Sequence, residues 1–197
     1  FESCSKLETI NVSVENQVYM SKDGVLFKHD ITELIKCPEG KKWRYSIPYG
    51  VKKITGSAFF YCSQLSYVSI PSSVSDIEID AFTSCSELSS IIIPSNVGRL
   101  DNTFRNCYKL SLVIFLGESI SGSSDVFPGC SKLTEVHVLP SYGSDSFCEI
   151  LPVKNCINTG SCGASTKYIF DNCTTTADET TTINEETTTI KEETTTI

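Results

Sequence analysis

Residues 65–85 read LSYVSIPSSVSDIEIDAFTSC, and the pattern of apolar, proline, phenylalanine and cysteine positions in this stretch recurs along the chain. Its clearest element is Phe-x-x-Cys-x-x-Leu, which occurs in copies that begin at Phe1, Phe59, Phe82, Phe104 and Phe127. The cysteines of the last four copies are 23, 22 and 23 residues apart. A repeat of this length is typical of solenoid proteins, in which each repeat forms one coil.

A short apolar alternation follows each copy and predicts a strand of about four residues. The side chains expected to face the core are Ile10, Val12, Val68, Ile70, Ile91, Ile93, Val113, Phe115, Val136 and Val138. Proline closes several of these strands, as at Pro71 and Pro94, and the chain must turn there. One coil alone buries too little apolar surface to fold, so the coils must stack with their strands parallel.

This frame resembles the BspA-like leucine-rich repeats over residues 1 to about 155. The resemblance implies an α/β-type repeat solenoid, a right-handed leucine-rich-repeat coil of four to five turns with a short-strand parallel sheet, mostly β and irregular. The segment at about 13–46 interrupts the repeats and is similar to the hairpin-bearing insertion of the same family. The family is associated with attachment of bacteria and single-celled parasites to host proteins, so the resemblance implies adhesion.

Three regions are predicted: a solenoid at 1–140, a cysteine-rich cap at 141–173 and a stalk at 174–197. We expect disulfides among the four cap cysteines, Cys148, Cys156, Cys162 and Cys173. Four cysteines allow three connectivities, and the sequence does not choose among them, although we favour Cys148 with Cys156.

The stalk is half threonine and carries repeated glutamates, which predicts disorder and O-glycosylation. Asn172-Cys-Thr and Asn11-Val-Ser match the N-glycosylation sequon, so Asn172 and Asn11 are candidate glycan sites. These features favour an extracellular or cell-surface location. The chain begins within the repeat pattern, so we expect it to be a fragment with further repeats upstream.

The net charge of −8 argues against a nucleic-acid partner, because binding to phosphates needs clustered cations. No run of 18 apolar residues is present, which predicts no membrane insertion within this fragment. The two histidines, His29 and His137, stand in no recognisable catalytic arrangement, and the repeat cysteines occupy one inward position as small apolar residues. We therefore predict no enzyme, no metal and no cofactor, and a monomer.

The residues between the inward ones form one outward strand face. Its candidates for binding extracellular or host proteins are Tyr67, Ser69, Ile92, Leu112, Ile114 and His137. Apolar side chains on a polar field are typical of a protein-binding patch, and changing Ile92 and Ile114 together to serine should leave the fold nearly intact. A surface coat assembled through the repeats is the alternative function, and a hydrolase upstream that uses this array as a targeting arm is another.

Overall fold

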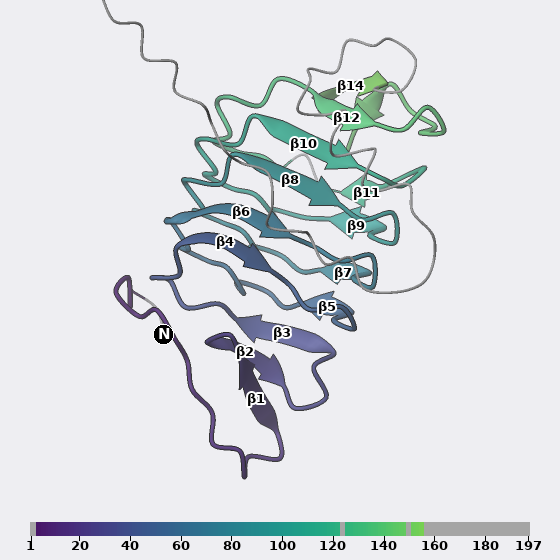
Figure 1. Ribbon diagram of the computed structural model, residues 1–197. Helices are drawn as coiled ribbons and strands as arrows, with labels where there is room; N and C mark the ends of the chain where they lie inside the picture. The colour runs from purple at the N-terminus through teal and green to yellow at the C-terminus, as the bar shows by residue number, and fades with distance from the viewer. Residues whose placement is uncertain (1–2, 123–124, 149–150, 156–197) are drawn as a thin grey trace, which may run out of the picture. The chain divides into compact units, whose positions relative to one another are not determined.

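The structure, a computed structural model, describes residues 3–122, 125–148 and 151–155, with only the backbone for the last range. This part of the chain forms a solenoid of stacked coils built from short strands and turns, and no helix occurs in it (Figure 1). The leucine-rich-repeat coil that the sequence predicts is confirmed. Within the described residues there is no helix of the length and apolarity needed to cross a bilayer.

One strand from each coil enters the larger sheet. In sheet order its strands are β13 (Ser146–Phe147), β14 (Leu151–Asn155), β12 (Val136–Val138), β10 (Leu112–Phe115), β8 (Ser90–Ile93), β6 (Leu65–Ser69) and β4 (Trp43–Ser46). The strands pair in parallel, except that β13 is antiparallel to β14. Pairing of β14 with β12 extends the sheet past residue 140, where the sequence pattern ends.

A second layer of short strands lies on the return side of the coils. It contains a five-stranded sheet, ordered β1 (Tyr19–Lys22), β2 (Val25–Lys28), β3 (Glu33–Lys36), β5 (Lys53–Ile54) and β7 (Asp76–Ile77), and a separate pair of β9 (Arg99–Leu100) with β11 (Ser121–Gly122). The return path is therefore more regular than predicted. The strands β7 and β9 do not pair, so this layer is interrupted between them.

The insertion predicted at about 13–46 contains the hairpin of β1 and β2. Asp23 and Gly24 form its two-residue turn with positive φ angles of 53° and 75°, as a tight hairpin turn requires. A Cβ on Gly24 would lie 2.9 Å from Cγ2 of Thr9, so the N-terminal segment passes close to the turn. The strand β3 is antiparallel to β2 and parallel to β5, and it joins the hairpin to the first coil.

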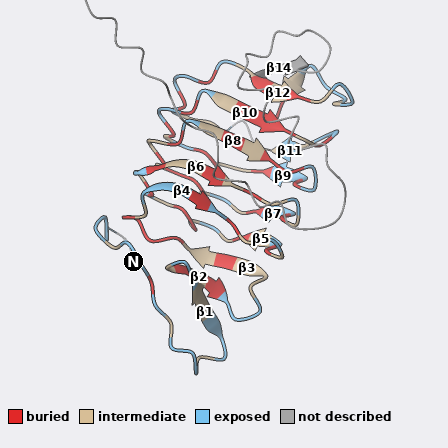
Figure 2. Cartoon of the chain, viewed as in Figure 1, coloured by how far each residue is buried: buried red, intermediate tan, exposed pale blue. Residues whose placement is uncertain are grey.

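Buried residues, red in Figure 2, recur on successive coils. Among them, phenylalanine rings stack from coil to coil. Ring centroids lie 4.8 Å apart for Phe59 and Phe82, 5.3 Å for Phe82 and Phe104, and 5.5 Å for Phe104 and Phe127. Neighbouring planes are within 14° of parallel. The four coils that begin at Phe59, Phe82, Phe104 and Phe127 place the ring at the same position within the coil, so the rings form a continuous stack.

The first copy of the frame departs from the prediction. Cys4 is exposed, and the structure assigns no strand at Ile10 to Val12. The segment lies against the first coil through single backbone hydrogen bonds, from Gly40 N–H to the Leu7 carbonyl and from Ile10 N–H to the Gly24 carbonyl. The prediction of a buried cysteine and a strand there is wrong. The segment makes single backbone hydrogen bonds to the residues beside it and does not pair with a strand of the sheet.

Candidate functional site

The outer face of the larger sheet carries the predicted binding residues in two rows. Register places Arg44, Tyr67, Ser90 and Leu112 side by side on β4, β6, β8 and β10. The second row contains Ile92, Ile114 and His137, which are register partners on β8, β10 and β12. Ser69 pairs with Ser46 on the same face. The six candidates therefore share one face, but Tyr67 and Leu112 lie in a different row from Ile92 and Ile114.

Exposure divides these candidates. The side chains of Tyr67, Ser69, Ile92 and Leu112 are partly exposed. Ile114, by contrast, is 0% exposed although it lies on the face opposite to the core residues Val113 and Phe115. The prediction that Ile114 belongs to an exposed stripe is wrong, and a serine there would place a hydroxyl in an enclosed site.

Ile114 has a register partner on each side in the row. Ile92 and His137 flank it in register, and the His137 side chain is itself only 12% exposed. The His137 Nε2 atom lies 3.4 Å from Oε1 of Glu135, two residues earlier in the chain. His137 is therefore held among its neighbours on the sheet, with little of its surface open to a partner.

Trp43 and Arg44 lie at the β4 end of this face, and sequence reasoning missed both as site residues. Trp43 is 75% exposed, and a β-bulge shifts the register between it and Arg44. The Arg44 guanidinium carbon lies 5.4 Å from the centre of the Tyr67 ring. The frame Cys37-x-x-Gly40-x-x-Trp43 stands 22 residues before the copy that begins at Phe59 and could have revealed this coil, although it places Trp43 at the position of a buried leucine.

Serine hydroxyls along the border of the face are used by the array itself. Ser66 Oγ donates to the Trp43 carbonyl at 2.9 Å, Ser89 Oγ to the Ser66 carbonyl at 3.3 Å, and Ser111 Oγ to the Ser89 carbonyl at 3.4 Å. Each bond joins one coil to the coil before it. These hydroxyls therefore tie neighbouring strands together where the chain enters the sheet.

The repeat cysteines form an interior column of thiols, as predicted for Cys62, Cys85, Cys107 and Cys130, all of which are buried. Each of the last three places Sγ close to the carbonyl oxygen of the phenylalanine one coil earlier: 3.1 Å from Cys85 to Phe59, 3.2 Å from Cys107 to Phe82 and 3.0 Å from Cys130 to Phe104. The thiols therefore act as weak hydrogen-bond donors as well as small apolar groups.

Cys37 extends this column and was not assigned from the sequence. Cys62 Sγ lies 3.7 Å from the Cys37 carbonyl, so Cys37 stands where later coils have phenylalanine. Burial raises the pKa of the Cys37 and Cys85 thiols well above the usual range. The hydrogen bond with Cys130, together with burial, raises the pKa of Cys107. Neutral thiols of this kind are poor nucleophiles and poor metal ligands.

The remaining predicted sites are only partly covered by the described residues. Cys148 is buried, while Cys156, Cys162, Cys173 and Asn172 lie outside the described residues, as does the predicted stalk. No disulfide joins two described residues. Asn11 is exposed in a segment without regular structure, which leaves its sequon accessible. The disulfide and glycan assignments stay predictions.

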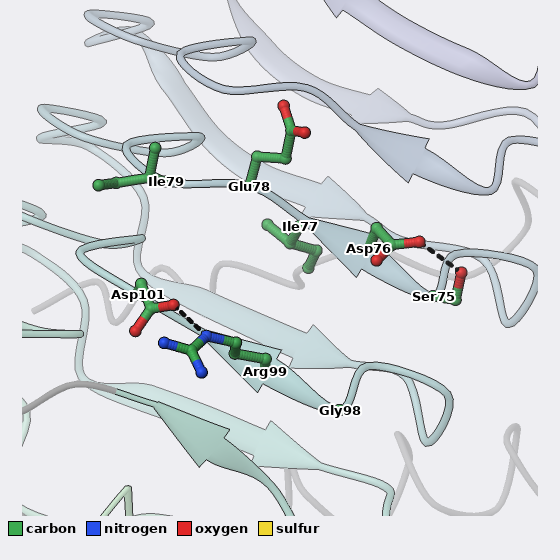
Figure 3. A pocket seen from close by; sticks show the side chains of 8 residues that line it. All are labelled: Ser75, Asp76, Ile77, Glu78, Ile79, Gly98, Arg99 and Asp101. Carbon is green, nitrogen blue, oxygen red and sulfur yellow. Dashed lines mark hydrogen bonds and ion pairs between the residues drawn. The ribbon is translucent and has the colours of Figure 1, made fainter.

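A hollow of about 700 Å³ lies on the return side, at the interruption between β7 and β9 (Figure 3). Its charged groups are matched locally: Arg99 Nε lies 2.5 Å from Asp101 Oδ2, and Lys53 Nζ 2.5 Å from Glu78 Oε1. Asp76 accepts a hydrogen bond from the Ser75 hydroxyl. No group of three or more histidine, cysteine or acidic side chains that could hold a metal occurs among the described residues. Most of the charge at the hollow is therefore neutralised locally, and the Asp76 carboxylate is engaged by a serine hydroxyl.

Comparison with solved structures gives three informative matches, and none of the curated proteins searched matches the chain. A leucine-rich repeat protein from Eubacterium ventriosum is 28% identical, with a TM-score of 0.61 over 77% of this chain and 43% of that one. A leucine-rich cell surface protein from Faecalibacterium prausnitzii is 26% identical, with a TM-score of 0.54 over 70% of this chain and 43% of that one.

The pneumococcal vaccine antigen PcpA is 24% identical, with a TM-score of 0.66 over 77% of this chain and 40% of that one. At this identity the match shows the fold alone. The chain thus spans less than half the length of these matched structures. The family model for the BspA type leucine-rich repeat region matches six copies over residues 36–149 and 101–195. With the frame, the coils and this match in agreement, the chain belongs to the BspA-type leucine-rich repeat proteins.

Proposed function

We propose that the chain is a cell-surface or secreted adhesion module that binds extracellular or host proteins through the outer face of its larger sheet. The observation that carries this proposal is the partial exposure of Tyr67, Ile92 and Leu112 on one face, bordered by serines. Apolar and aromatic side chains within a polar border are typical of protein-binding surfaces. A solved leucine-rich cell surface protein of similar fold supports the proposed location.

A non-enzymatic role fits the chemistry of the described residues. Burial raises the pKa of the Cys37 and Cys85 thiols, which keeps them protonated at neutral pH, and Arg99 and Glu78 at the hollow between β7 and β9 are each in an ion pair. A rigid stack of coils instead presents a large, nearly fixed surface, which lowers the entropic cost of binding a partner. Binding without catalysis is the function that this arrangement favours.

The test is capture of the full chain by extracellular-matrix and cell-surface proteins immobilised on a solid support. The variant carries Ile92→Ser with Leu112→Ser, and the matched control is Ile79→Ser, because Ile79 is 55% exposed on the return side. Loss of capture in the double variant alone, with the variant still folded at the assay temperature, supports the proposal. Equal capture by all three proteins rejects it, and concentration-dependent self-association in sedimentation with no capture favours a surface coat.

A further inference from the structure

Trp43 occupies a coil position that the other coils give to a buried leucine. It is the register partner of Leu65, and the leucines that follow at this position, Leu88, Leu110 and Leu133, are also buried. Trp43 is instead 75% exposed. Burial in the core is the usual contribution of a tryptophan to stability, so this ring makes little use of its apolar surface within the fold.

The backbone at Trp43 is held in a left-handed conformation with a φ angle of 64°. None of the other described coils has a positive φ angle at its leucine or at the residues on either side of it. The conformation is unfavourable for a bulky side chain, and the register with β6 shifts by one residue between Trp43 and Arg44. An outward tryptophan kept in a strained backbone points to a role outside the fold.

The residues around Trp43 are the most basic stretch of an acidic chain. Residues 41–44 read Lys-Lys-Trp-Arg, and no other run of four residues holds three cations. Lys41 Nζ donates to the Asp23 carbonyl and lies 5.3 Å from the centre of the Tyr45 ring, and Lys42 Nζ lies 2.5 Å from Glu8 Oε1. Arg44 makes no ion pair with any described residue.

We propose that Trp43 and Arg44 anchor an acidic segment of a protein partner, an inference that rests on the function proposed above and names the partner's chemistry. The Arg44 guanidinium binds a carboxylate through two parallel N–H donors. The Trp43 ring covers an apolar side chain beside that carboxylate. Tryptophan, arginine and tyrosine are the residue types that most often dominate binding energy at interfaces. The Tyr67 ring packs against the Arg44 guanidinium and holds it in place.

A protein segment fits this pair better than a polyanion. One guanidinium without an ion pair among the described residues, beside an apolar ring, matches a single carboxylate next to an apolar side chain. A chain of phosphates or sulfates instead needs several clustered cations. Two of the three nearby cations are already engaged by Asp23, Tyr45 and Glu8. The net charge of −8 also repels a long polyanion from the rest of the molecule.

The experiment uses the labelled full chain on an array of synthetic peptides. Each peptide pairs glutamate or aspartate with one apolar residue, and a copy of it carries glutamine or asparagine in place of the acid. We expect binding to acidic peptides at least tenfold above their amide copies, and weaker binding at high salt. Equal binding to acid and amide copies, no binding to either, or competition by heparin stronger than by acidic peptides overturns the proposal.

Because the chain has a single tryptophan, its fluorescence reports directly on Trp43 during titration with the best acidic peptide. Saturable quenching or a spectral shift is expected in the natural chain and in the control Arg105→Gln, which changes an exposed arginine on another coil. Arg44→Gln should abolish the response. A response that survives in Arg44→Gln overturns the proposal.

Trp43→Gly separates binding from folding. Glycine adopts the left-handed conformation without a steric cost, so this variant should unfold at the same temperature as the natural chain or higher while losing peptide binding. A lowered unfolding temperature would mean that Trp43 serves the fold and would overturn the proposal. If Trp43→Gly retains capture of whole proteins while Ile92→Ser with Leu112→Ser loses it, the anchor fails and the proposed function stands. If none of these variants loses capture, both fail.

Discussion

The Sγ atom of Cys107 lies 3.2 Å from the carbonyl oxygen of Phe82 on the preceding coil. The same contact joins Cys85 to Phe59 and Cys130 to Phe104. Each thiol therefore links its coil to the preceding coil through a weak hydrogen bond. The phenylalanine rings stack beside these contacts. The phenylalanine and the cysteine of the repeat frame therefore make different contacts between coils: the rings pack against one another, and the thiols donate weak hydrogen bonds.

Serine should replace Cys107 better than alanine does. A hydroxyl in the same place can donate to the Phe82 carbonyl, whereas alanine loses the donor and leaves a small cavity. We expect Cys107→Ala to lower the free energy of unfolding by about 1–2 kcal/mol and Cys107→Ser to lower it by less. Urea unfolding of both variants checks the order. Equal losses would show that packing alone accounts for the cysteine.

Thiol reactivity should separate Cys4 from the column. Cys4 is exposed, whereas Cys37, Cys62, Cys85 and Cys107 are enclosed. In the folded protein at neutral pH, iodoacetamide should modify Cys4 before any of the column thiols, which should react only after unfolding in urea. Peptide mass spectrometry assigns each modification. Rapid labelling of Cys85 in the folded protein would contradict the interior column.

Alkaline pH should destabilise the folded protein through the same thiols. The pKa values of Cys37, Cys85 and Cys107 are raised in the folded state, so the unfolded chain loses these protons first as pH rises. Their contribution is complete below the ordinary thiol pKa of 9.0 and is lost progressively above it, toward the raised folded values. Urea unfolding across this range should show the decline, and Cys85→Ala should reduce its slope.

Tyr45→Phe should stabilise the protein. The Tyr45 hydroxyl is buried without a hydrogen-bond partner among the described residues, and burial raises its pKa. Removing an unsatisfied buried hydroxyl recovers its desolvation cost, which is about 1–2 kcal/mol. The free energy of unfolding should rise by that amount. A fall would indicate a bound water or other partner at the hydroxyl.

The repeat frame predicted the positions that recur in every coil. It did not predict the positions at which a coil departs from the repeat. Cys62 to Cys130 and the inward strand residues lie where the spacing places them, because every stacked coil repeats one geometry. Cys37 was missed because it stands at a phenylalanine position. The two-residue strands β5, β7, β9 and β11 are too short to give an alternation.

The side of the sheet on which a side chain lies and its exposure to solvent are different properties. The sequence predicts only the side. Alternation placed Ile92 and Ile114 correctly on the outer face, but whether a side chain there meets water depends on the neighbouring strands. Trp43 shows the same limit at the backbone level. A positive φ angle at an aromatic residue has no compositional signal, so the sequence could not predict that this ring turns outward.

The two isoleucines on the outer face should respond differently to the same substitution. Ile114→Ser removes a fully buried side chain and encloses a hydroxyl, so we expect it to lower the free energy of unfolding by about 2–4 kcal/mol. Ile92→Ser, at a partly exposed position on the adjacent strand, should cost about 1 kcal/mol or less. Urea unfolding of the two variants with the Ile79→Ser control gives the comparison. Equal costs at Ile92 and Ile114 would mean that Ile114 is open to solvent in solution, and Ile114 would then return to the binding surface.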